Sequence, residues 1–154
     1  MDSFKWSDSY NLGIDLIDAQ HKQIVVYIDT LNSAILNENI DKIYEVLDKM
    51  KDYTMDHFAF EEQLMEKAGY VLSDAHKQVH RRFEEKVADF EHQIRSGTDP
   101  LSVARKIRNA LMTWLIQHIK HEDTDYVPVV KKYLNKETSW IGGALKKIFG
   151  TENA

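Results

Sequence analysis

The chain contains no cysteine in its 154 residues. This absence excludes disulfide bonds, thiolate metal sites, a cysteine nucleophile and a haem attached through a Cys-x-x-Cys-His motif. Any metal that the protein binds must therefore be held by nitrogen and oxygen atoms.

Proline and glycine are also scarce, with two and six residues respectively. Long stretches in the middle of the chain lack both, which favours helices over a sheet. No run approaches about 18 consecutive apolar residues, and the N-terminus lacks a basic start followed by an apolar segment. We therefore expect no membrane span and a cytoplasmic location.

The charge balance gives no sign of a polyanionic partner. The formal net charge is -5, and the basic residues are scattered among acids rather than gathered in a stripe, so we expect no nucleic-acid partner. With 43% hydrophobic residues, a chain of this length can bury one sizeable core.

Apolar residues recur at steps of three and four in four segments, which is typical of amphipathic helices. The first two segments span about residues 18–37 and 39–68. The third runs from residue 73 to the turn at Ser96, and the fourth runs from residue 100 to beyond residue 118. A short turn at Gly69 separates the second segment from the third, and residues 96–100 separate the third from the fourth. The pattern predicts an all-α fold, an antiparallel up-down-up-down four-helix bundle with an extended N-terminal arm and a short C-terminal amphipathic helix.

Each of the four apolar stripes carries histidine, and the predicted topology brings these residues to one end of the bundle. Burying them unpartnered would cost about 2–7 kcal/mol for each polar group, and a metal centre removes that cost. His92 and His121 fall outside the set. The convergent residues are His21, His57, Glu61, His76, His80 and His118.

Imidazole and carboxylate ligands without thiolate suit iron, zinc, copper or manganese. One zinc ion takes about four ligands, so six convergent groups fit two metals better. The chain has neither His-Glu-x-x-His nor Glu-x-x-His, so it lacks the signatures of metalloproteases and of ferritin-like di-iron proteins. An imidazole-rich site favours a ferrous pair and reversible exchange with dioxygen. A haem between two histidines is the alternative, but it leaves the other histidines without a role.

Four motifs agree in order and spacing with those of a known family. His57-x-x-x-Glu61, His76-x-x-x-His80, His118-x-x-x-x-Asp123 and the segment GIDLIDAQHKQ at 13–23 resemble the hemerythrins. The resemblance covers residues 6–133 and is greatest to single-domain bacterial members, the bacteriohemerythrins.

The resemblance implies two non-haem iron ions joined by an oxo or hydroxo bridge. His76, His80 and His118 would bind one iron, His21 and His57 the other, and Glu61 and Asp123 would bridge both. Counting ligands leaves one open position, on the iron with two histidines, and dioxygen binds there in the family.

In a regular helix, a different carboxylate would face the metals. At about 100° per residue, Glu122 lies about 40° from His118 around the helix, whereas Asp123 lies about 140° away. Following the family pattern, we expect Asp123 to be the ligand. This choice requires a π-bulge or kink near Lys120, or an approach to the metals from another side of the helix.

The wall of the open position should be apolar, because water and protons promote loss of superoxide. Ile24 follows His21, and three residues that flank His118 resemble the oxygen pocket of the family. The predicted pocket consists of Ile24, Trp114, Leu115 and Ile119.

We expect residues 1–135 to form the bundle domain. Residues 136–154 form an amphipathic tail that carries Trp140, Ile141 and the adjacent lysines Lys146 and Lys147. Docking of the tail on the bundle is the simpler interpretation, and peripheral contact with a membrane or a partner is the other.

The predicted function is reversible dioxygen binding for storage, transport or delivery to an oxygen-using enzyme. No nucleophile–base pair, phosphate loop or cofactor fingerprint indicates that the chain is an enzyme. The alternatives are a di-iron oxidoreductase that acts on peroxide or nitric oxide, and an oxygen- or iron-sensing module.

Overall fold

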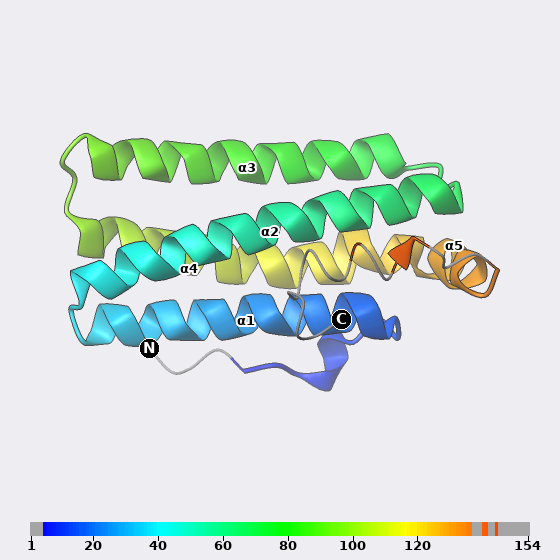
Figure 1. Cartoon of the computed structure of the whole chain (residues 1–154), viewed down its shortest axis with the longest axis horizontal. Helices are drawn as coiled ribbons and strands as arrows, with labels where there is room; N and C mark the ends of the chain where they lie inside the picture. Colours follow the sequence, from blue (N-terminus) through cyan, green and yellow to red (C-terminus); the bar gives the residue numbers. More distant parts are fainter. Residues whose placement is uncertain (1–4, 137–139, 142–143, 145–154) are drawn as a thin grey trace.

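Four long helices run antiparallel in a computed structural model that describes residues 5–136, 140, 141 and 144 (Figure 1). The helices are α1 (Asp15–Leu36), α2 (Ile40–Ala68), α3 (Ser73–Arg95) and α4 (Pro100–Gln117). Each helix lies beside the one that follows it in the chain, in up-down-up-down order. The predicted all-α four-helix bundle is confirmed.

Local sequence signals set most helix ends. The Asn39 side chain accepts a hydrogen bond from the Lys42 backbone N–H at the start of α2, as expected for an N-cap. Gly69 ends the same helix in the left-handed conformation, with φ of 76°, which glycine adopts without a steric penalty. At the start of α4, Asp99 is the cap and Pro100 occupies the first turn.

The first helix begins three residues earlier than the sequence predicted, at Asp15 rather than Asp18. Asp18 lies inside the first turn, where its carboxylate accepts hydrogen bonds from the backbone N–H groups of Leu12 and Gly13. Its role is therefore to hold the N-terminal arm against the helix. The described part of that arm contains one 3-10 turn, η1 (Asp8–Tyr10).

The buried apolar side chains form two clusters separated by a polar layer. The larger cluster includes Ile24 and Leu31 and fills the bundle away from α5. The smaller one includes Ile17 and Tyr126. Because His21 lies between Ile17 and Ile24 on α1, the layer of buried polar residues falls between the two clusters.

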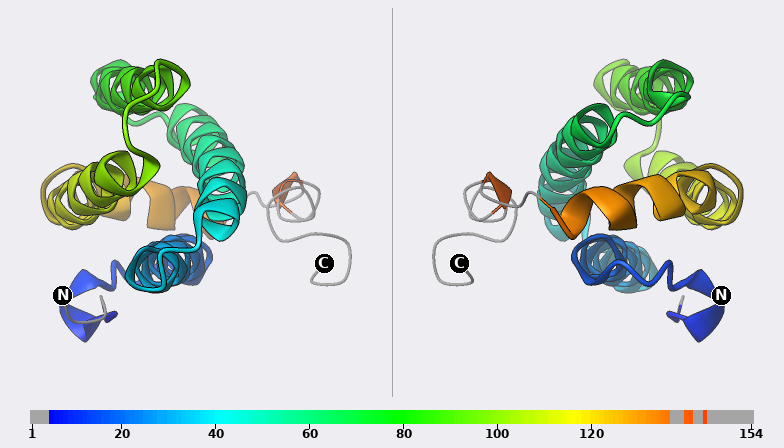
Figure 2. Two further views of the ribbon diagram at one scale, coloured as in Figure 1. Left: turned by 90° about the vertical axis from the view of Figure 1, so that its left-hand side faces the viewer. Right: turned by 90° about the vertical axis from the view of Figure 1, so that its right-hand side faces the viewer.

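The fourth helix does not continue as a regular α-helix. A π-helical segment, η2 (His118–Asp123), follows α4 and leads into α5 (Thr124–Leu134). Figure 2 shows α5 crossing the end of the bundle instead of extending along it. Its buried residues, Tyr126 and Val130, pack on the smaller apolar cluster.

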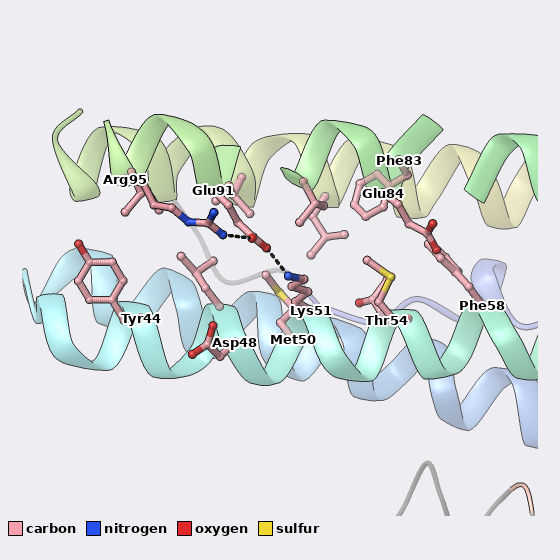
Figure 3. A pocket seen from close by; sticks show the side chains of 16 residues that line it. Tyr44, Asp48, Met50, Lys51, Thr54, Phe58, Phe83, Glu84, Glu91 and Arg95 are labelled. Atoms are coloured by element: carbon pink, nitrogen blue, oxygen red, sulfur yellow. Dashed lines mark hydrogen bonds and ion pairs between the residues drawn. The ribbon is translucent and has the colours of Figure 1, made fainter. Parts of the chain in front are cut away.

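The third helix packs closely only along its first half. Its buried residues end with Phe83. Val87, Phe90 and Ile94 continue the same apolar stripe at steps of three and four, but they are only partly buried. Val87 and Ile94 line a cavity that residues of α2 and α4 also line (Figure 3).

Four residues of the tail are described, namely Lys136, Trp140, Ile141 and Ala144. The Trp140 indole N–H donates to the Tyr133 hydroxyl at 2.6 Å, and its ring lies 5.5 Å from that of Phe60. Ile141 is buried in the smaller cluster. Most of the predicted amphipathic helix lies outside the described residues, so its conformation and the domain boundary at 135 stay predictions.

Within the described part of the chain, no helix is both long and apolar enough to cross a membrane.

Candidate metal centre

The structure brings the seven side chains predicted as metal ligands together in the polar layer. They come from α1, α2, α3 and η2, and all are buried. His92 and His121 are exposed, as expected for residues outside the set. The seven are His21, His57, Glu61, His76, His80, His118 and Asp123.

The two oxygens of Glu61 face different histidines. Oε1 lies 2.9 Å from Nε2 of His76 and 2.9 Å from Nε2 of His80. Oε2 lies on the other side, 3.6 Å from Nε2 of His57. The Tyr126 hydroxyl donates a hydrogen bond of 2.9 Å to Oε2 and fixes the orientation of the carboxylate.

The two oxygens of Asp123 also face different histidines. Oδ1 lies 2.9 Å from Nε2 of His118 and 3.1 Å from Nε2 of His76. Oδ2 lies 3.1 Å from Nε2 of His21. Both carboxylates therefore stand between a group of three histidines and a group of two.

The π-helix explains how Asp123 reaches the centre. The backbone N–H of Thr124 bonds to the carbonyl of Ile119, five residues earlier, and the Thr124 hydroxyl donates to the same carbonyl at 2.8 Å. The extra residue in this turn rotates Asp123 inward. Glu122 stays at the edge, with a side chain 37% exposed. The predicted departure from α-helical geometry near Lys120 is confirmed.

The arrangement of the donor atoms suits metal coordination better than hydrogen bonding among themselves. Nε2 of His118 lies 3.2 Å from Nε2 of both His76 and His80, yet each neutral ring nitrogen can either donate or accept only once. Neither Nε2 of His21 nor either oxygen of Asp123 has a partner with hydrogen-bond geometry. Three donors on one face of an octahedral ion, each at about 2.1 Å, lie about 3.0 Å apart, close to the spacing seen here.

Potential ligands form two groups in the described part of the chain, and both contain Glu61. One group consists of Glu61 with His76, His80 and His118, and the other of Glu61 with His21 and His57. Each of these two adjacent groups could hold a metal ion, and the two groups share the Glu61 carboxylate.

Comparison with known proteins agrees with this site. The family model described as "Hemerythrin HHE cation binding domain" matches residues 12–130. The chain belongs to the hemerythrin family. It is 40% identical over 151 residues to the bacteriohemerythrin of Stenotrophomonas maltophilia (strain R551-3), a match that covers 94% of this chain and 97% of the relative.

More distant hemerythrins share the same architecture. The myohemerythrin of Theromyzon tessulatum is 27% identical over 80% of this chain and 90% of its own. The crystal structure of a wild-type hemerythrin superposes with a TM-score of 0.73 at 28% identity, covering 84% of this chain and 98% of that one. Membership in the hemerythrin family implies non-haem iron, and the buried imidazoles and carboxylates form a suitable site.

Three residues that orient this hemerythrin site were missed in the sequence. The Gln20 carbonyl oxygen lies 2.6 Å from Nδ1 of His57, and Glu62 lies 2.8 Å from Nδ1 of His80. When Nδ1 carries the proton, each Nε2 lone pair points into the centre. Gln20 directly precedes His21, and Glu62 directly follows Glu61. Tyr126 lies three residues after Asp123. Closeness to the motifs in the sequence is therefore the signal that could have identified these three residues.

Burial and pairing give the site groups unusual proton affinities. Burial lowers the pKa of His57 to about 3, so this ring is neutral at physiological pH. Burial alone would raise the pKa of Glu61, but hydrogen bonds with three histidines outweigh it and hold that pKa well below its ordinary value. Burial likewise opposes the charged form of His76, yet the adjacent carboxylates of Asp123 and Glu61 raise its pKa to about 9.

The stability of the metal-free protein should consequently depend on pH. The pKa of His76 is about 9 in the folded chain against an ordinary value of 6.5. A raised pKa means that the protonated ring stabilises the fold, fully below pH 6.5 and progressively less as the pH rises through 9. We expect the Tm of the metal-free protein, measured by calorimetry, to fall across this range. The metal-loaded protein is the control, because coordination displaces the proton; a flat or rising Tm without metal would contradict the assignment.

The residues of the predicted oxygen pocket lie around the histidines. Ile24, Leu115 and Ile119 are 0%, 1% and 2% exposed. The Trp114 ring stacks on His118, with centroids 4.4 Å apart and planes at 15°, and it is partly exposed. The first three are buried in the larger apolar cluster, whereas Trp114 covers one face of the His118 ring.

Proposed function

We propose that the protein binds dioxygen reversibly at a di-iron centre, for storage, transport or delivery to an oxygen-using enzyme. His76, His80 and His118 would hold one iron, His21 and His57 the other, and Glu61 and Asp123 would bridge the pair. The assignment rests on one observation. In both Glu61 and Asp123, one carboxylate oxygen faces the three-histidine group and the other oxygen faces the two-histidine group.

When bound, a ferrous pair supplies the electrons that dioxygen takes up and returns on release. The chain's role is to keep this exchange reversible. Its site offers five imidazoles and two carboxylates, a donor set poorer in anionic oxygen than one built mainly from carboxylates, and therefore less suited to stabilising highly oxidised iron.

The two-histidine side is the proposed place for dioxygen. The protein supplies one imidazole fewer there than on the side of His76, His80 and His118. His57 on this side is kept neutral by burial, which lowers its pKa to about 3. Ile24 lies on α1, three residues after His21, and is fully buried, so it helps to exclude water and the protons that water would deliver.

The apolar wall should slow irreversible oxidation. Replacing Leu115, which is 1% exposed, with alanine would leave space for water beside the centre. We expect the L115A variant to autoxidise at least severalfold faster in air, followed as the decay of the oxygenated visible spectrum. The L31A variant, with a cavity in the larger cluster away from the site, should keep the wild-type rate. An unchanged rate in L115A would contradict the assignment of this wall.

Metal and oxygen stoichiometry test the proposed site. Metal analysis of protein isolated from its own cells should give two irons per chain, and manometry should give one dioxygen taken up per iron pair. A single metal per chain, or a pair that takes up no dioxygen, would contradict the proposal.

A further inference from the structure

A chain of charged side chains leads from the metal centre to the surface between α2 and α3. It begins at His80, whose Nδ1 lies 2.8 Å from Oε2 of Glu62. The Arg81 guanidinium pairs with Glu62 through one nitrogen and with Glu84 through another. The His80 side chain is fully buried, and that of Glu62 is 12% exposed. These contacts connect a proposed iron ligand to a charged group that is largely shielded from water.

The network keeps a net negative charge beside His80. Two carboxylates, those of Glu62 and Glu84, share the single guanidinium of Arg81. Neither carboxylate pairs with another lysine or arginine in the described part of the chain. One negative charge is therefore not neutralised within the network. Because Glu62 is mostly buried, its electrostatic effect on the centre exceeds that of a carboxylate in water.

The outer contacts on the two-histidine side carry no charge. Nδ1 of His57 lies 2.6 Å from the side-chain oxygen of Gln20, which belongs to a neutral amide. Nδ1 of His21 has no hydrogen-bond partner. Among the described residues, His80 is the one ligand histidine with a carboxylate within hydrogen-bonding distance of Nδ1. The two sides of the centre consequently differ in the charge that surrounds their imidazoles.

A carboxylate at Nδ1 makes an imidazole a stronger metal ligand at Nε2. A hydrogen bond to a charged acceptor is about twice as strong as one to a neutral acceptor, and it raises the basicity of the ligating nitrogen. The negative charge also favours the more positive oxidation state of a nearby metal. Both effects of Glu62 should stabilise ferric iron relative to ferrous iron on the side of His80.

We propose that Glu62 is a positioning residue that sets the reduction potential of the centre through His80, and that Arg81 attenuates its charge. This proposal rests on the di-iron assignment of the proposed function. It adds a difference between the two irons. The charged contact favours ferric iron on the three-histidine side, whereas Gln20 orients His57 without adding charge on the side proposed for dioxygen.

Anaerobic spectroelectrochemical titration of the full-length, iron-loaded protein tests the proposal. Glu62→Gln retains a hydrogen-bond acceptor of similar shape but removes the charge. Loss of such an outer contact weakens metal binding about 10–100-fold. We expect ferric binding to weaken at least about tenfold more than ferrous binding, which raises the one-electron potential by at least about 59 mV.

The sign of the shift separates a charge effect from a loosened site. Arg81→Gln leaves Glu62 without its cation, so the potential should fall below that of the wild type. Gln20→Glu gives His57 a charged contact and should also lower the potential. A site that is merely loosened would shift in the same direction in E62Q and R81Q. Metal analysis and circular dichroism check that each variant keeps two irons and its helices.

Glu66→Gln is the matched control, because Glu66 on α2 also pairs with a cation on α3, Lys77, but contacts no ligand histidine. Its potential should equal that of the wild type. An unchanged potential in E62Q, or shifts of the same sign in E62Q and R81Q, would overturn the proposal. If E62Q does not fold, a potential that fails to fall in R81Q or Q20E would overturn it.

A second measurement requires neither iron nor dioxygen. In NMR spectra of the zinc-loaded protein, the Nδ1 proton of His80 should move upfield in E62Q and stay in place in E66Q, because a neutral acceptor forms the weaker hydrogen bond. An unmoved proton in E62Q would contradict the proposed contact. If the potentials and this proton shift as expected but oxygenation is irreversible, the proposed function fails and the role of Glu62 stands.

Discussion

Replacing Asp123 with alanine should eliminate the di-iron absorption bands and lower metal affinity at least about 100-fold. The carboxylate lies 2.9 Å from His118 on one side and 3.1 Å from His21 on the other. No other described carboxylate except Glu61 reaches both histidine groups. Loss of a group that only orients a ligand already weakens metal binding about 10–100-fold, so loss of a bridging ligand should cost more.

Glu122→Ala is the matched control, because Glu122 is the neighbouring carboxylate and the one a regular helix would have placed at the metals. Its nearest oxygen lies 3.7 Å from Nδ1 of His118, on the outer side of that ring. We expect E122A to keep two irons and the visible bands with small shifts. Loss of the bands in E122A and their retention in D123A would reverse the assignment of the bridge.

Removing the metal should lower the Tm by about 8–16 °C. Without ions, seven buried polar side chains lose their common partner, and Nε2 of His21 and both oxygens of Asp123 lack hydrogen-bond partners. Binding at a thousandfold excess over Kd contributes about 4 kcal/mol, and a chain of this size shifts its Tm by about 2–4 °C per kcal/mol.

Calorimetry of the chelator-treated and reloaded protein measures this difference. The variant L31A provides the control, because Leu31 is fully buried in the larger cluster, away from the site. L31A should lower both Tm values and leave the difference between them unchanged. Equal Tm values with and without metal in the wild type would show that the buried cluster is stable without ions.

The bundle and the meeting of its histidines were predictable because both follow from spacing. Apolar residues at steps of three and four define a helix face, and short turns force neighbouring helices to run antiparallel. His21 near the start of one helix and His57 toward the end of the next then fall at the same end. Their separation in sequence is irrelevant to this argument.

The features that depend on packing between helices were not predictable in the same way. Regular periodicity continues along α3 through Val87 and Ile94, but the structure leaves them beside a cavity because α3 diverges from α2. The turn into α5 was also missed, since nothing in the apolar pattern marks where the fourth helix leaves the bundle. Proximity to a motif indicates Glu62 as a candidate, but only coordinates show that it faces Nδ1 of His80.

The placement of Asp123 is an intermediate case. Helix geometry showed that an ideal α-helix and the family motif disagree, and the disagreement itself predicted a local irregularity. The π-helix at His118–Asp123 resolves it, because one additional residue in the turn changes which side chain faces inward.

The most direct test is the visible spectrum of the iron-loaded protein during one cycle of anaerobic reduction, exposure to air and evacuation. Two ions held by five imidazoles and two shared carboxylates, behind an apolar wall, should give a colourless reduced form, a coloured form in air and a return to colourless under vacuum. This cycle should repeat with two irons retained per chain. Irreversible bleaching after the first exposure, accompanied by turnover of peroxide or nitric oxide, would contradict reversible oxygen binding and indicate an oxidoreductase.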